Sequence, residues 1–376
     1  MKRLYFDWNA SAPVRTEVSE LVYEIHKSCG NPSSVHSEGR RARSIIEESR
    51  SRIRSLLKAE DYKIIFTSGA TESNNLAILG FERNCINKGL APLYISSLAE
   101  HSSIIEPLRA LERRGVQVHW HSDHFIKKNE LEGKSYNSGN PVFVSSMIAN
   151  NETGHLFDAL ESKEIKTAHY HCDAVQVLGK VNFSVANVCY DTVTLSSHKI
   201  GGPVGAGALL VRDESSLSAI QFGGAQEYSL RAGTENAAAI AGFARAIEIV
   251  TTELELNYQK LLRLNTLLRS LILARVPDTK ILTPAGRFLP NTLSILFPGL
   301  DGRSLVIALD LQGVAASVGS ACASGSIEPS HVLLALGFTP EEARSVVRLS
   351  FGHLTTDGDI ADLVTRLDAV VKRLRV

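Results

Sequence analysis

The chain has 376 residues, 44% of them hydrophobic, and its 40 basic residues balance its 40 acidic ones. This composition is typical of a globular chain long enough for two domains, and it excludes a disordered protein. A formal net charge of zero gives no electrostatic reason to expect a nucleic-acid or membrane-surface partner.

Neither a targeting segment nor a disulfide framework is expected. The start, MKRLYFDWNASAP, reaches Asp7 and Asn9 before an apolar segment develops, so we expect no secretory signal. No uninterrupted apolar stretch is long enough to span a bilayer. The five cysteines are odd in number and lack CxxC spacing, which argues against disulfide pairing and a zinc ribbon. We therefore expect a cytoplasmic protein without a metal site.

Seven short runs rich in β-forming residues alternate with longer helical patterns. They are KIIFTS (63–68), PLYISS (92–97), VQVHWH (116–121), PVFVSSMI (141–148), AHYHC (168–172), DTVTLSS (191–197) and GALLVR (207–212). This alternation predicts βα units, hence an α/β fold with a mainly parallel seven-stranded sheet covered by helices. The polar stretch 122–140 is expected to be a surface excursion.

The pattern after Thr234 is helical to about Ala274, with Pro277 as a stop. Two further apolar runs, NTLSILFPG and VVRLSFG, then interleave with helical patterns at 302–312, 329–337 and 357–374. This arrangement predicts a second, smaller α+β domain joined by a long helix. We place the large domain at 14–255 and the small domain at 1–13 and 256–376.

Polar residues crowd the carboxyl ends of the predicted strands. In open α/β sheets the ligand crevice lies outside these ends, so the clusters are expected to converge on one site. The clusters are Ser68-Gly69-Ala70-Thr71, Glu100-His101, Asn150-Asn151-Glu152, Asp173 and Ser196-Ser197-His198-Lys199.

Lys199 follows a predicted strand and precedes a glycine run in TLSSHKIGGPVGAGALLV. A lysine there can form a Schiff base, although an exposed loop lysine is the alternative. Pyridoxal phosphate (PLP) would also need a phosphate cradle, an acid at the pyridine nitrogen and a planar group over the ring. The amides of Ala70 and Thr71 in FTSGATESNNLAI suit the cradle, and Asp173 and His101 suit the other two roles, each with a simple cap or turn as its alternative.

The run GSACASGS (319–326) places Cys322 among glycine, serine and alanine. A free cysteine usually behaves as a small buried hydrophobe, so a thiol in such a stretch indicates reactivity more often than packing. Cys172, beside Asp173, is interpreted as a small strand residue and not as a second nucleophile.

Nine motifs together give the chain a resemblance, nearly from end to end, to the PLP-dependent cysteine desulfurases of the NifS/IscS type. These enzymes are class V aminotransferases of fold type I. The motifs are FDWNASAPV, GNPSSVHSEGRRAR, FTSGATESNNLAI, AEHSS, ANNETG, CDAVQ, SSHKIGGPVGAG, RAGTEN and GSACASGSIEPSHVL.

The resemblance implies a role for each matching residue. Lys199 would be the Schiff-base lysine, Asp173 the pyridinium partner, and His101 the stacking imidazole and a proton-transfer group. Arg348 would bind the substrate carboxylate. The remaining cofactor contacts would be Ala70, Thr71, Ser196 and His198 at the phosphate, Thr234 from the other subunit of a homodimer, and Asn151 and Gln176 at the ring oxygen.

Cys322 would be the nucleophile that takes sulfur from L-cysteine, leaving alanine and a persulfide. The persulfide would pass to an acceptor protein, such as an iron–sulfur scaffold or a thiolation protein, and Cys322 could transiently ligate an iron–sulfur cluster. The form GSACASG resembles the long-loop branch of the family, which favours direct delivery to partners.

Two positions depart from the family pattern, and neither departure removes a catalytic group. His353 stands where the family often has an arginine, and the segment 155–168 is short, so a helix there is expected to be truncated. A selenocysteine lyase or another class V transaminase would keep Lys199 and Asp173, but a transaminase has no use for Cys322. A non-catalytic sulfur-assembly scaffold is the alternative from a different class.

Overall fold

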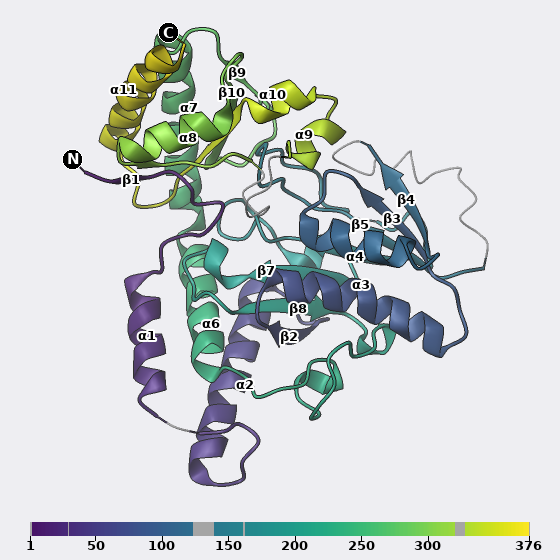
Figure 1. Cartoon of the computed structure of the whole chain (residues 1–376). Coiled ribbons are helices and arrows are strands. Elements are labelled where there is room, and N and C mark those ends of the chain that lie inside the picture. Colours follow the sequence, from purple (N-terminus) through teal and green to yellow (C-terminus); the bar gives the residue numbers. More distant parts are fainter. Residues whose placement is uncertain (1, 29, 123–138, 161, 320–327, 376) are drawn as a thin grey trace.

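The computed structural model describes residues 2–28, 30–122, 139–160, 162–319 and 328–375 (Figure 1). Its centre is a seven-stranded sheet in the order β2-β8-β7-β6-β5-β3-β4, in which only β8 runs antiparallel to its neighbours. The seven predicted runs form these seven strands, so the predicted α/β fold is confirmed. The strands are β2 (Lys63–Thr67), β3 (Leu93–Ser97), β4 (Gln117–His121), β5 (Val142–Ser145), β6 (His169–Asp173), β7 (Thr192–Ser196) and β8 (Gly207–Val211).

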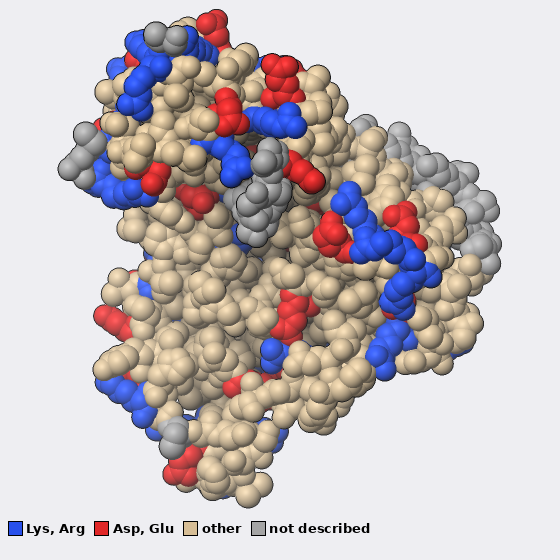
Figure 2. Space-filling view, viewed as in Figure 1, with Lys and Arg blue, Asp and Glu red and all other residues tan. Residues whose placement is uncertain are grey.

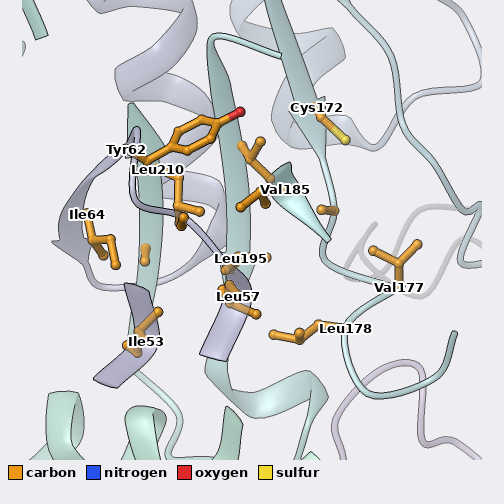
Figure 3. Packing of buried hydrophobic residues seen from close by; sticks show 14 of the residues in the cluster. Ile53, Leu57, Tyr62, Ile64, Cys172, Val177, Leu178, Val185, Leu195 and Leu210 are labelled. Carbon is orange, nitrogen blue, oxygen red and sulfur yellow. The ribbon is translucent and has the colours of Figure 1, made fainter. Parts of the chain in front are cut away.

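Both faces of the sheet carry apolar side chains because successive strand residues point to opposite faces. Ile64 packs in the core that contains Ile53 and Leu57 of α2 (Figure 3), whereas Ile65 packs in the core that contains Leu76 of α3. The helices that contribute to the first core are α1 (Thr16–His26), α2 (Ser37–Leu57) and α6 (Ala237–Thr252), and those of the second are α3 (Ala70–Asn87) and α4 (Ser102–Glu112).

A smaller unit surrounds a separate apolar core at the end of the molecule that Figure 1 draws uppermost. Its antiparallel sheet has the order β12-β10-β9, and β1 pairs with β11 in parallel. The division into two domains and its boundaries stay a prediction. The elements are β1 (Leu4–Tyr5), α7 (Leu254–Arg275), β9 (Lys280–Ile281), β10 (Thr292–Leu296), α8 (Gly302–Leu311), β11 (Val314–Ala315), α9 (His331–Ala335), α10 (Pro340–Arg344), β12 (Val346–Ser350) and α11 (Asp357–Leu374).

The long helix predicted after Thr234 is two helices, α6 and α7, which meet at Glu253. Glu253 leaves the helical region, with φ −89° and ψ 1°, and its carboxylate accepts a hydrogen bond of 2.8 Å from Arg15 before α1. Apolar periodicity continues through this break, which is why the sequence pattern does not reveal it. The described part of 155–168 contains no helix, and most of the predicted surface excursion at 122–140 lies outside the described residues.

Lysines and arginines are interspersed with acidic residues on the face drawn in Figure 2. This mixture accords with the balanced composition of the chain. Among the described residues, no helix combines the length and apolar character needed to cross a membrane.

Candidate active site

One cavity of about 430 Å³ lies at the carboxyl ends of the central strands. It gathers side chains from positions that lie far apart in the sequence, as the strand-end clusters predict. The predicted site residues that line it are Ala70, Thr71, His101, Asn151, Asp173, Gln176, His198, Lys199 and Arg348.

Three predicted site residues are not in this lining. Ser196 is buried at the end of β7, and within the described part of the chain its hydroxyl oxygen has no hydrogen-bond partner. Thr234 is exposed, just before α6. Cys322 lies outside the described residues, but Gly319, three positions before it, lines the cavity.

The amino-terminal end of α3 forms one wall of the cavity. Gly69 precedes the helix with φ +154°, a conformation that side chains disfavour, and Ala70 and Thr71 begin its first turn. A Cβ atom at position 207 would lie 2.7 Å from the Cα of Gly69, so both glycines allow β8 to pass close behind the turn. Free backbone N–H groups and the positive end of the helix dipole favour an anion here.

Lys199 ends the short 3₁₀ helix η2 (Ser197–Lys199), which follows β7 directly. Its Nζ donates hydrogen bonds to the carbonyl oxygens of Asn9, at 2.7 Å, and Ala10, at 2.9 Å. The segment before α1 therefore holds this amine at the cavity. Asn9 belongs to the motif FDWNASAPV, but the sequence alone predicts no role for it.

Asp173 is the last residue of β6. Its Oδ1 accepts a hydrogen bond from the backbone N–H of Val175 at 3.0 Å, and its Oδ2 accepts one from Asn74 at 2.9 Å. Asn74 is fully buried in α3 and also donates to the hydroxyl of Ser103 at 2.8 Å. These bonds fix the carboxylate in one orientation at the cavity, and Asn74 is a site residue that the sequence analysis missed.

His101 is the N-cap of α4, and its Nδ1 accepts the backbone N–H of Ser103 at 3.1 Å. Because Nδ1 accepts this bond, the hydrogen-bond pattern assigns the ring proton to Nε2. Burial lowers the pKa of His101; Lys199 and His331 lower it further, and Asp173 opposes the shift. The imidazole at the cavity wall is therefore neutral.

A second set of hydrogen bonds links Asn74 of α3 to strands β6 and β7. Its Oδ1 lies 3.0 Å from Nε2 of His171, whose Nδ1 lies 2.9 Å from the hydroxyl of Thr192. Since the amide oxygen of Asn74 only accepts, Nε2 of His171 carries the proton. Burial lowers the pKa of His171 to about 3, so this ring is a neutral structural link.

Arg348, in β12, is 2% exposed and is the predicted site residue that the smaller unit contributes to the cavity lining. It donates to Asp7 at 2.7 Å and to the carbonyl oxygen of Asn151 at 3.0 Å, while its buried Nε has no hydrogen-bond partner among the described residues. His353, the departure noted in the sequence, packs edge-on against Trp8 with ring centroids 5.2 Å apart. The hydrogen-bond partners of Arg348 are thus Asp7 and Asn151, not His353.

The aminotransferase class-V family profile matches residues 4–363 of the chain. The chain belongs to the class-V aminotransferase family. Among curated relatives, cysteine desulfurase IscS of Dictyoglomus turgidum is 36% identical over 100% of this chain and 96% of its own. Cysteine desulfurase IscS 1 of Archaeoglobus fulgidus is 38% identical over 99% and 97%. A solved NifS-like protein from Rickettsia africae has a TM-score of 0.87 at 32% identity and covers 99% of this chain and 100% of its own.

Enzymes of this class-V family, its cysteine desulfurases included, depend on PLP, and the cavity fits that group. The end of α3 and the unpartnered hydroxyl of Ser196 suit a phosphate, and the fixed carboxylate of Asp173 suits a protonated ring nitrogen. The unpartnered Nε of Arg348 suits a substrate carboxylate. The donors present therefore match the cofactor and an amino-acid substrate.

Two of the described cysteines, Cys172 and Cys85, are buried. Cys172 is fully buried in β6 (Figure 3), and burial, followed by the nearby Asp173, raises the pKa of its thiol well above the ordinary value. Cys85 is buried in α3, and burial raises its pKa to about 11. Both thiols are thus poor nucleophiles, since the thiolate is the reactive form. Cys29, like Cys322, lies outside the described residues.

Glu100 gives a prediction about stability. Burial, followed by the nearby Asp173, raises its pKa from 4.5 to about 8, so the folded chain holds a neutral acid at pH 7. The unfolded chain ionises this group near pH 4.5, so stability is lost as the pH rises from there to about 8. At ~1.4 kcal/mol per pKa unit, Glu100→Gln can recover at most about 5 kcal/mol at pH 8. We expect its Tm to be several degrees above that of wild type at pH 8 and equal at pH 4.5.

The matched control is Glu106→Gln, which changes an exposed carboxylate in α4 that pairs with Arg109. It is expected to leave Tm within about a degree at both pH values, because exposed ion pairs contribute little. A Glu100→Gln variant that is less stable than wild type at pH 8 would contradict the buried neutral acid.

Proposed function

We propose that the chain is a PLP-dependent cysteine desulfurase that converts L-cysteine into L-alanine and carries the sulfur as a persulfide on Cys322. The observation that supports this most is the convergence of Lys199, Asp173 and the end of α3 on one cavity. The names of the curated relatives point to the same activity.

The cofactor would be held by side chains and backbone groups around the cavity at the carboxyl ends of the strands. Bound PLP supplies an aldehyde that condenses with amines and a pyridinium ring that withdraws electrons. The proposed holding residues are Ala70, Thr71, Ser196 and His198 at the phosphate, Asp173 at the ring nitrogen, Asn151 and Gln176 at the ring oxygen, His101 over the ring and Lys199 at the aldehyde.

The side chains of the cavity perform separate tasks in this proposal. Asp173, oriented by Asn74, keeps a proton on the ring nitrogen through its carboxylate. Lys199 provides the amine that binds and releases the cofactor and moves protons at the substrate. The neutral ring of His101 lines the cavity, where it would stack over the cofactor ring, and Arg348 binds the substrate carboxylate.

Cys322 would receive the sulfur. The C–S bond of L-cysteine breaks and an S–S bond forms at the thiol of Cys322, so that L-cysteine and the thiol give L-alanine and a persulfide without any external oxidant. The position of Gly319 in the cavity lining supports this assignment. The persulfide then passes to an acceptor protein of iron–sulfur cluster assembly or of tRNA or cofactor thiolation.

Thr234 supports a homodimer in this proposal. By the family resemblance it would complete the phosphate site of a partner subunit, and it is exposed and outside the cavity of its own chain. Sedimentation of the active holoenzyme is expected to give a dimer. A fully active monomer would remove this part of the proposal.

The activity is tested with purified protein reconstituted with PLP. L-Alanine should form from L-cysteine in the presence of a reductant that removes the persulfide, and L-serine, which lacks the sulfur, should give none. A chain that binds PLP but forms no alanine would leave the non-catalytic scaffold as the better description. A much higher rate with L-selenocysteine, unaffected by loss of Cys322, would favour the selenocysteine lyase.

A further inference from the structure

Lys180 is a buried lysine that the proposed function does not use. It is 7% exposed and lies four residues after Gln176 in the turn that follows β6. Within the described part of the chain it forms no ion pair with an acidic residue. Burial lowers its pKa well below the ordinary value, and the nearby cations Lys199 and Arg348 lower it further. Burying a lysine in such surroundings costs free energy, which indicates a specific role.

The amine of Lys180 is bonded to two side-chain amides. Its Nζ donates to Oδ1 of Asn9 at 3.1 Å and makes a short hydrogen bond to Oε1 of Gln176. Asn9 is bonded through both ends of its amide, because Oδ1 also accepts from Asn291 at 3.0 Å and Nδ2 donates to Thr292 at 2.8 Å. Removing Lys180 would therefore leave Asn9 in place.

Gln176 depends on Lys180 more strongly. Its Nε2 donates to the carbonyl oxygen of Asn9 at 3.2 Å, and its Oε1 has Lys180 as its donor. A lysine amine carries at least two N–H groups whether it is charged or neutral, and both amides face it with their oxygens. The reversed orientation of Gln176 would place its amide oxygen against the carbonyl oxygen of Asn9 and would take an acceptor away from the N–H groups of Lys180.

This orientation determines what Gln176 offers to the cavity that it lines. An amide nitrogen carries two N–H groups, of which Asn9 accepts one. The second has no protein acceptor among the described residues and is a donor for a negatively charged oxygen. An amide with the opposite orientation would present a carbonyl oxygen and repel such a group.

We propose that Lys180 is a positioning residue that fixes the amide of Gln176, so that Gln176 presents an N–H, and not a carbonyl oxygen, to the phenolic oxygen of the bound cofactor ring. The inference rests on the proposed PLP function of the cavity. Lys180 itself touches neither cofactor nor substrate in this account. Its contribution is transmitted entirely through Gln176.

The test is a double-mutant cycle on the full chain, with PLP affinity measured by equilibrium dialysis. All variants carry Lys199→Ala, so that binding reports non-covalent contacts alone. Lys180→Met and Gln176→Met should each weaken PLP binding about tenfold, as expected for one hydrogen bond to a charged oxygen. The double variant should be no weaker than Gln176→Met alone, within about twofold.

Lys163→Met is the matched control, since Lys163 is a half-buried lysine outside the cavity that pairs with Asp191 at 2.6 Å. It should leave PLP affinity unchanged. Gln176→Glu tests polarity directly, and does so even if Lys180→Met fails to fold. It keeps an oxygen partner for Lys180 but removes the donor to the carbonyl oxygen of Asn9 and offers the cofactor only oxygens. PLP binding should therefore fall at least a hundredfold, with folding of the variant checked by its thermal unfolding.

Additive losses in the double variant, or wild-type PLP affinity in Gln176→Glu, would overturn the positioning role and leave the proposed function standing. If the wild-type chain binds no PLP, the proposed function is overturned, and this inference with it. In the holoenzyme that retains Lys199, the absorption maximum of the bound cofactor should shift equally in Lys180→Met and Gln176→Met. A shift in Gln176→Met alone would also contradict the proposal.

Discussion

Replacing Lys199 with alanine is expected to abolish covalent attachment of PLP and to reduce alanine formation from L-cysteine at least ~10³-fold. The variant lacks both the amine that binds the cofactor and a proton-transfer group. Loss of the proton-transfer group alone lowers the rate ~10²–10⁴-fold. Borohydride treatment followed by denaturation should leave the cofactor on the Lys199 peptide of wild type and on no peptide of the variant.

Lys163→Ala is the control for this prediction, because it removes a half-buried lysine that pairs with Asp191 away from the cavity. Its activity and cofactor content should match those of wild type. Retention of a borohydride-reducible bond in Lys199→Ala would show that another amine carries the cofactor.

Cys322→Ala is expected to separate cofactor chemistry from sulfur transfer. The variant should bind PLP with wild-type affinity and still change its absorbance when L-cysteine is added, because the described groups around the cavity remain. Alanine release should fall at least ~10²-fold, since no thiolate is left to accept the sulfur. Absorbance spectra and a chromatographic assay for alanine measure the two effects separately.

Cys189→Ala is the control for loss of a thiol, since Cys189 is half-buried and does not line the cavity. It should turn over at the wild-type rate. Full turnover in Cys322→Ala would move the assignment to a lyase that needs no protein thiol.

The central sheet could be predicted from the sequence because each of its strands is a short apolar run bounded by polar or turn residues. The runs at 63–68 and 207–212, for example, became β2 and β8 with small changes at their ends. The strands β1, β9 and β11 have two residues each and carry no periodicity that could be recognised. They form because tertiary pairing supplies their hydrogen bonds.

The cavity lining could be predicted in large part, because strand ends and motif residues carry a local signal. The residues beneath it could not. Asn74, His171 and Lys180 act through hydrogen bonds between segments distant in sequence, and no spacing rule identifies such partners. Asp7, which pairs with Arg348 across the chain, was missed for the same reason. Their only sequence signal is a polar residue inside an otherwise apolar stretch or a motif.

The most direct test of the account maps sulfur on the wild-type holoenzyme by mass spectrometry after treatment with L-cysteine and no acceptor. The account predicts that the peptide containing Cys322 gains the mass of one sulfur atom, removable by a thiol reductant, with one L-alanine formed for each sulfur bound. Peptides containing Cys29, Cys85, Cys172 and Cys189 should remain unmodified. Sulfur on Cys172, or alanine formed without any protein-bound sulfur, would contradict it.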